Sequence, residues 1–156
     1  MAKIKFENYN GLKNEINNPR GIAKKELKNG YAVVIKTNAK GEDEVDLATG
    51  DEEAKAIEWF VWNVIDTPEL DNQGDFVIKE GAKVRAFKFQ DGVEYDISGD
   101  LVEGTYADIT VGKVLIPTTT GKYKVADLET GYKTALTVTQ KINFGGQGFV
   151  VRKGSN

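Results

Sequence analysis

The chain of 156 residues contains no cysteine and no histidine. Without cysteine it can form neither a disulfide nor a Cys-based zinc site, and it has no thiolate nucleophile. The absence of histidine removes the side chain whose unperturbed pKa suits proton transfer near neutral pH, and it also removes the commonest ligand of transition metals. We therefore expect a protein that is not an enzyme and that binds no metal or cofactor.

Long apolar runs are missing too. Nowhere do some 18 apolar residues follow one another, the length that a membrane-spanning helix needs. The N-terminal segment MAKIKFENYNGLKNE contains no apolar run of signal-peptide length. We expect a soluble protein that is made in the cytoplasm and does not contact a membrane.

The net charge of −3 is unevenly spread along the chain. The first 30 residues hold seven Lys and Arg against three Glu, a net charge of +4, which leaves −7 for the remainder. An acidic body argues against binding to nucleic acid, because phosphate recognition requires clustered positive charge. The basic segment has two interpretations: it docks on an acidic protein partner, or it is a solvated tail.

Two parts of different character follow one another. Residues 1–28 are rich in Asn, Lys and Glu, and the Asn18-Pro19 pair would break a helix, so we predict an irregular or extended N-terminal arm. A body spanning residues 29–156 begins sharply at the turn signal Asn29-Gly30. Apolar residues then alternate at strand period from Tyr31 to Lys36.

Further along the body, one helical turn is expected at Asp51–Ala56, before an aromatic run at Ile57–Ile65 that suits a buried strand. A short strand at Phe76–Ile78 precedes a glycine turn and a second strand that ends at Phe89. The Asp91-Gly92 pair is a strong hairpin signal, and we expect it to pair that second strand with the segment VEYDI.

The last third of the body carries three more strand signals. A break in alternation at Gly112 predicts a β-bulge. The segment ALTVTQKINF predicts a half-buried antiparallel strand, and GGQG at 145–148 turns the chain into a closing strand, FVVR, that pairs with it. Nine or ten strands at this spacing predict an all-β fold, an antiparallel sandwich or barrel with an extended N-terminal arm.

Several clusters resemble chemical sites but fit a structural role better. DNQGD at 71–75 resembles the start of a calcium loop, but Phe76 stands where such a loop needs glycine and Ala82 where it needs the final glutamate. The acids in GDEEAK favour a helix N-terminus, and GGQG lacks the lysine of a phosphate loop. Lys122-Tyr123-Lys124 and the segment Lys83–Lys88 interleave basic and aromatic residues as single-strand-binding barrels do, although the acidic body argues against that function.

The segment from Trp59 to Trp62 allows three interpretations: core packing, a carbohydrate platform, or an anchor in a protein interface. A glycosidase needs only two carboxylates, whose separation the sequence does not give. Such an enzyme would require a cleft that holds a carboxylate with a raised pKa.

Four segments are similar to a known family: LKNGYAVVIK, WNVIDTPELDNQGDFVIKEGAKVRAF, DGVEYDISGDLV and ITVGKVLIPTTTGKYK. Over about residues 27–125 the chain resembles the head decoration, or capsid cement, proteins of tailed bacteriophages of Gram-positive hosts. In these proteins a lysine-rich NGY entry strand is followed by a DF-IKEG-KVRA hairpin and a VGK-L-P strand.

The resemblance implies a β-rich structural protein of the virion that binds the outer surface of an assembled capsid and reinforces the shell against the pressure of the DNA. Its partner would be the major capsid protein, its place the capsid exterior after synthesis in the host cytoplasm, and its assembly in some cases a homotrimer on the capsid.

In this interpretation the arm makes the capsid contact. Its apolar residues would become ordered on the capsid, and its lysines would add attraction and steering. The candidate residues are Ile4, Phe6, Tyr9 and Leu12, with Lys3, Lys5 and Lys13.

The alternative is a carbohydrate- or receptor-binding β module of a phage tail. Four aromatic residues would then form its sugar platform: Trp59, Trp62, Tyr95 and Tyr106.

Overall fold

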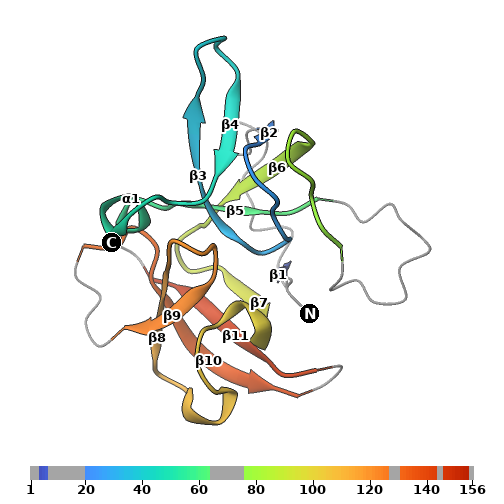
Figure 1. Cartoon of the computed structure of the whole chain (residues 1–156). Coiled ribbons are helices and arrows are strands. Elements are labelled where there is room, and N and C mark those ends of the chain that lie inside the picture. Colours follow the sequence, from blue (N-terminus) through green and yellow to red (C-terminus); the bar gives the residue numbers. More distant parts are fainter. Residues whose placement is uncertain (1–3, 7–19, 64–75, 127–130, 144–145, 155–156) are drawn as a thin grey trace.

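The computed structural model describes residues 4–6, 20–63, 76–126, 131–143 and 146–154 (Figure 1). The strands are β1 (Ile4–Phe6), β2 (Arg20–Ala23), β3 (Ala32–Thr37), β4 (Asp43–Asp46), β5 (Trp59–Val61), β6 (Lys83–Lys88), β7 (Glu94–Ser98), β8 (Val114–Pro117), β9 (Tyr123–Ala126), β10 (Leu136–Ile142) and β11 (Gly148–Lys153). The single α-helix of these ranges is α1 (Asp51–Lys55), and two 3-10 turns are η3 (Gly99–Leu101) and η4 (Tyr106–Asp108). The all-β prediction is confirmed.

The earlier strands form a closed barrel in the order β2-β4-β3-β5-β6. Every pair in it is antiparallel except β2 with β4, which run parallel with Ile22 opposite Glu44. The pairing of β2 with β6 closes the barrel. Gly21 permits the close approach of β2 to β4, because a Cβ at this position would lie 2.6 Å from the carbonyl oxygen of Asp43.

The remaining strands form a six-stranded sheet in the order β1-β7-β11-β10-β8-β9. All of its pairs are antiparallel. The last strand of the chain, β11, therefore lies in the interior of the sheet between β7 and β10, while β1 and β9 form its two ends. In Figure 1 the sheet fills the lower half of the molecule, and the barrel lies above it.

One hydrophobic core joins the barrel to the sheet. Phe60 and Phe89 contact Tyr95 at ring-centroid distances of 5.5 and 5.3 Å, and Phe89 also lies 6.3 Å from Tyr123. All four rings are at most 2% exposed. A second cluster takes buried residues from each of the five barrel strands and fills the barrel interior. Burial of large aromatic rings dominates the energetics of such a core.

Hydrogen bonds also cross from one half to the other. The Tyr123 hydroxyl donates to the carbonyl of Gly30 at 2.9 Å, and the Thr134 hydroxyl donates to the carbonyl of Ile57 at 2.7 Å. The N–H of Ala32 donates to the carbonyl of Gly121 at 2.8 Å. Since a buried polar group without a partner is costly, these bonds fix how the sheet sits on the barrel.

The prediction of a hairpin at Asp91-Gly92 is wrong. The turn exists, with Gly92 at φ +76°, but it carries the chain from β6 in the barrel to β7 in the sheet, and these two strands do not pair. Its partners lie in β11: the Gly92 N–H donates to the Lys153 carbonyl at 2.9 Å, and the Lys153 ammonium bonds the Asp91 carboxylate. These long-range bonds, which no local signal predicts, direct β7 away from β6.

The start of the body also differs from the prediction. We expected an arm to Lys28, yet β2 is one strand of the barrel, and Leu27 is fully buried and forms a bridge with Ile78. The strand expected at Phe76–Ile78 is not formed; in its place Ile78 makes this single isolated bridge. Residues 20–28 therefore belong to the barrel, because closing it requires a strand between β4 and β6.

The buried strand expected at Ile57–Ile65 is shorter than predicted, since β5 ends at Val61 and residues 64–65 lie outside the described ranges. The Trp62 N–H still donates to the Arg85 carbonyl at 3.1 Å, but at Asn63 a side chain replaces the backbone ladder: the Asn63 carboxamide accepts from the Arg85 N–H at 2.9 Å and donates to the Lys83 carbonyl at 3.0 Å. An asparagine side chain can thus supply the hydrogen-bond partners that the backbone groups of β6 need once the backbone after β5 no longer pairs with them.

Other local predictions are confirmed. Helix α1 lies where the single helical turn was expected, β10 and β11 form the predicted antiparallel pair, and β3 occupies the alternating segment after Gly30. At Gly112 two residues oppose one: the Gly112 N–H donates to the Val138 carbonyl, and the Val138 N–H donates to the carbonyl of Lys113, both at 2.8 Å. This arrangement is a β-bulge.

Candidate functional site

Four of the seven candidate capsid-binding residues lie outside the described ranges: Lys3, Tyr9, Leu12 and Lys13. The backbone of the other three forms β1, which pairs antiparallel with β7: Ile4 is opposite Ile97, Lys5 opposite Asp96, and Phe6 opposite Tyr95. Part of the expected arm is therefore an end strand of the sheet.

The pairing of β7 shows which of its backbone groups face β1. The Lys153 N–H donates to the Val93 carbonyl at 3.2 Å, and the Gly99 N–H donates to the Gln147 carbonyl at 2.8 Å. Backbone groups of alternate residues point to opposite sides of an antiparallel strand. The odd-numbered residues of β7 thus bond β11, and the N–H and C=O of Asp96 face β1.

At the opposite end of the sheet, β9 is partly covered. Val102 forms a parallel bridge with Tyr123, and the Glu103 N–H donates to the Tyr123 carbonyl at 2.7 Å. Lys124, next along β9, is exposed. Lysine on an edge strand discourages pairing with other chains, so β9 is the better protected end.

A second exposed feature is the β3–β4 hairpin, which extends beyond the rest of the barrel (Figure 1). The Asn38 side chain organises its tip: it accepts from the N–H groups of Lys40 and Glu42 at 2.9 and 3.0 Å, and it donates to the carboxylates of Glu42 and Glu44 at 3.2 and 3.3 Å. Asparagine side chains bond backbone groups of the residues that follow them, and Gly41 adopts a φ of +78°, so Asn38 and Gly41 are the residues in the sequence that signal this turn.

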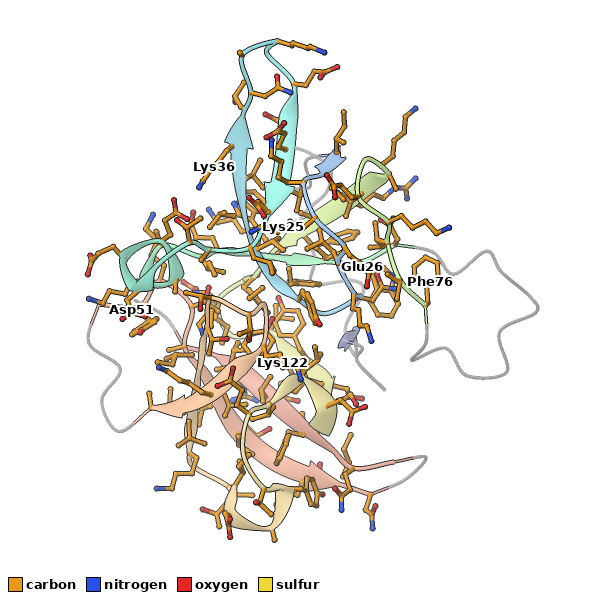
Figure 2. The ribbon with its side chains drawn as sticks, viewed as in Figure 1. Lys25, Glu26, Lys36, Asp51, Phe76 and Lys122 are labelled. Atoms are coloured by element: carbon orange, nitrogen blue, oxygen red, sulfur yellow. The ribbon has the colours of Figure 1, made fainter. Side chains whose placement is uncertain are left out.

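Helix α1 is tied to this hairpin. Lys36 of β3 bonds the Glu53 carboxylate at 2.7 Å, and Figure 2 shows Lys36 on the hairpin and Asp51 at the start of the helix. The Lys36 ammonium, together with the N–H and hydroxyl of Thr49, lowers the pKa of Glu53 to about 2. The acids of GDEEAK therefore occupy a helix N-terminus, as predicted.

The pKa of the Glu44 carboxylate is also lowered, first by the hydrogen bond from Lys24 and then by the one from Asn38. The described residues contain no group of three or more His, Cys, Asp or Glu side chains that could hold a metal ion. The calcium-like segment 71–75 lies outside them.

The aromatic platform of the alternative function is contradicted at one position. Tyr95 is fully buried, burial raises the pKa of its hydroxyl to about 12, and that hydroxyl accepts a hydrogen bond from the Gln90 N–H at 3.0 Å. Tyr106 donates to the Ile142 carbonyl and packs on Phe149. The four aromatic residues therefore do not form one exposed surface.

The two tryptophans differ from the phenylalanine between them. Phe60 is a core residue, whereas Trp59 and Trp62 are half-buried at the margin of the two clusters. The Lys88 ammonium lies 5.8 Å from the centroid of the Trp59 ring. Core packing, one of the three interpretations of this segment, thus holds for Phe60. Tyr123, between two lysines, is also buried and cannot stack on a base.

Within the described residues, no helix is long and apolar enough to cross a membrane. Comparison with known proteins finds no protein-family model and no curated protein sequence that matches the chain.

Proposed function

We propose that the protein is a structural component of a phage virion that binds the outer surface of the assembled capsid and stabilises the shell. Its partner is the major capsid protein, and its role is a binding role with no catalytic step. The proposal combines the family resemblance with the way in which the resembling segments are used in the fold.

The observation that carries the proposal is the distribution of those segments. They supply β3 and β6 of the barrel as well as β7, β8 and β9 of the sheet. A likeness confined to one hairpin could recur in unrelated β proteins. A likeness that supplies strands to both halves, and that includes Tyr123 at the junction between them, supports a common architecture.

The arm supplies the contact with the capsid. Among the described residues β1 is an end strand, and an extended segment of the capsid protein would add to its outer edge by main-chain hydrogen bonds. The lysines of the arm add attraction to an acidic capsid surface and speed association. The acidic body, repelled by the same surface, would orient away from the shell.

Co-sedimentation with emptied, expanded capsids that lack the decoration protein tests the proposal. The full chain should bind at a fixed, saturating ratio to the capsid subunit, and that ratio distinguishes a monomer from a trimer. A chain lacking residues 1–19, which retains the whole of β2, should bind at least tenfold more weakly if hot-spot contacts lie in the arm.

Two results would contradict the proposal at different levels. If the full chain fails to bind any capsid, the structural role is wrong. If the shortened chain binds as well as the full chain, the protein decorates capsids but the arm is not the contact. Circular dichroism of both chains confirms that each is folded before binding is compared.

A further inference from the structure

We propose that β7 is an acceptor edge for β1 of a second copy of this chain, so that residues 4–6 of one copy complete the sheet of its neighbour. The exchange would link copies into an oligomer. It requires no capsid, so it stands or falls separately from the proposed function.

The acceptor is an incomplete edge without β1. Among the described residues, β7 has β11 on one side and the three-residue strand β1 on the other. If β1 leaves, the backbone N–H and C=O of Asp96 lose the strand that they face. Edge strands with unpaired backbone groups pair readily with strands of other chains. This edge of β7 is therefore suited to an extended segment of either the same chain or another one.

The connection between β1 and the rest of the chain is long. Thirteen residues, 7–19, connect β1 to β2. Such a connection can span up to about 43–47 Å. A folded chain of this length has a radius of gyration of about 15 Å. The connection is thus long enough for β1 to reach β7 of an adjoining copy, and its length does not oblige β1 to pair within its own chain.

Exchange conserves the backbone pairing of the strand. The same three backbone pairs form whether β1 comes from the same chain or from another, and they place Lys5 opposite Asp96, a pair of opposite charge, in either case. Exchange of an identical element is a low-cost route to oligomers for this reason. A strand of three residues at the end of a sheet can open without global unfolding, so barrel and sheet stay folded during the exchange.

A second copy of the chain is also the partner whose strand is known to fit the edge of β7. Its residues 4–6 have the same sequence as β1, whose register on β7 the structure gives. Each copy both donates and accepts one strand, so the contact closes into a ring when the geometry allows it.

Because the chain has no cysteine, introduced thiols are the only ones present. We would mix two single variants, K5C and D96C, and treat the mixture with a short thiol-to-thiol cross-linker. Directly opposite residues of an antiparallel pair have Cβ atoms about 4.5–5.5 Å apart. A link between position 5 of one chain and position 96 of another forms efficiently only if β1 of the first lies on β7 of the second.

The matched control replaces D96C by K40C, a thiol at the exposed tip of the β3–β4 hairpin. Peptide mass spectrometry should find the 5–96 link about tenfold more often than the 5–40 link, because paired strands hold their thiols at high effective concentration. Equal yields of the two links would overturn the proposal.

A second measurement uses no introduced thiol. Sedimentation equilibrium should show that the full chain associates as its concentration rises, and that a chain lacking residues 1–6 remains monomeric at the same concentrations. A full chain that stays monomeric throughout, with 5–96 links found only within single chains of a K5C/D96C double variant, would equally overturn the exchange.

Discussion

At the scale of single residues, the junction between barrel and sheet depends on positions where one added atom changes the packing. Gly121 is a turn residue, with φ +83°. It also lies against the ring of Tyr31, where a Cβ would come within 2.7 Å of a ring carbon. The turn could be predicted from neighbouring residues, whereas the contact with a distant tyrosine could not.

Replacing Gly121 by Ala should destabilise the protein more than replacing Gly41, a turn glycine at φ +78° with no neighbouring atom within 4 Å. The positive φ costs both variants about 1–2 kcal/mol. The clash with Tyr31 should add about 1–3 kcal/mol to G121A alone. Urea unfolding of G121A and G41A measures the difference, and equal midpoints would show that Tyr31 moves aside freely.

The carboxylate of Glu53 should make stability depend on pH in a defined window. Its pKa falls from 4.5 to about 2 on folding, so the charged form stabilises the folded chain above pH 4.5, and that contribution is lost as the pH falls towards 2. E53Q should therefore lower Tm at pH 7 and converge with the unchanged protein near pH 2. E52Q, which loses only an exposed ion pair with Lys55, should change Tm little at either pH.

At the scale of elements, the sequence correctly predicted those helices, strands and turns that depend on residues near each other in the chain. Helix α1, the alternation of β3, the bulge at Gly112 and the β10–β11 pair all follow from turn residues and hydrophobic period. The partition of β6 and β7 between barrel and sheet did not follow, because bonds to Lys153 decide it from more than sixty positions away. The register of β1 on β7 is non-local for the same reason.

The β3–β4 hairpin should depend on Asn38 for its rigidity. N38A removes four side-chain hydrogen bonds at the exposed tip. Because these bonds compete with water, the loss of global stability should be small, about 1 kcal/mol. Amide exchange should rise at residues 38–42 and not in β5 or β6. K40A, which retains the Asn38 side chain, should leave exchange at the tip unchanged.

At the scale of the whole molecule, the barrel and the sheet share their largest core. Buried residues of both halves form a single cluster that includes Phe60, Tyr95 and Leu136. The sequence predicted a sandwich or a barrel, and the fold is a closed barrel packed on a separate sheet. The residue pattern predicts the strands but not that five of them close into a barrel, because closure depends on which strands distant in the sequence pair with each other.

The two halves should therefore unfold together. Both tryptophans lie in the barrel half, so fluorescence reports that half, whereas far-UV circular dichroism reports both. V138A, a substitution in the sheet at a side chain 1% exposed, should cost about 2 kcal/mol and shift both signals by the same amount. A fluorescence midpoint that stays in place while the dichroism midpoint moves would show two independent units.

The interior position of β11 governs the order of assembly on the ribosome. The barrel strands lie between residues 20 and 88, so the barrel can close while the rest of the chain is still being made. The sheet cannot, because its middle strand, ending at Lys153, is synthesised last. Until then the aromatic face around Phe60 stays uncovered, and the nascent chain is most prone to aggregation in this interval.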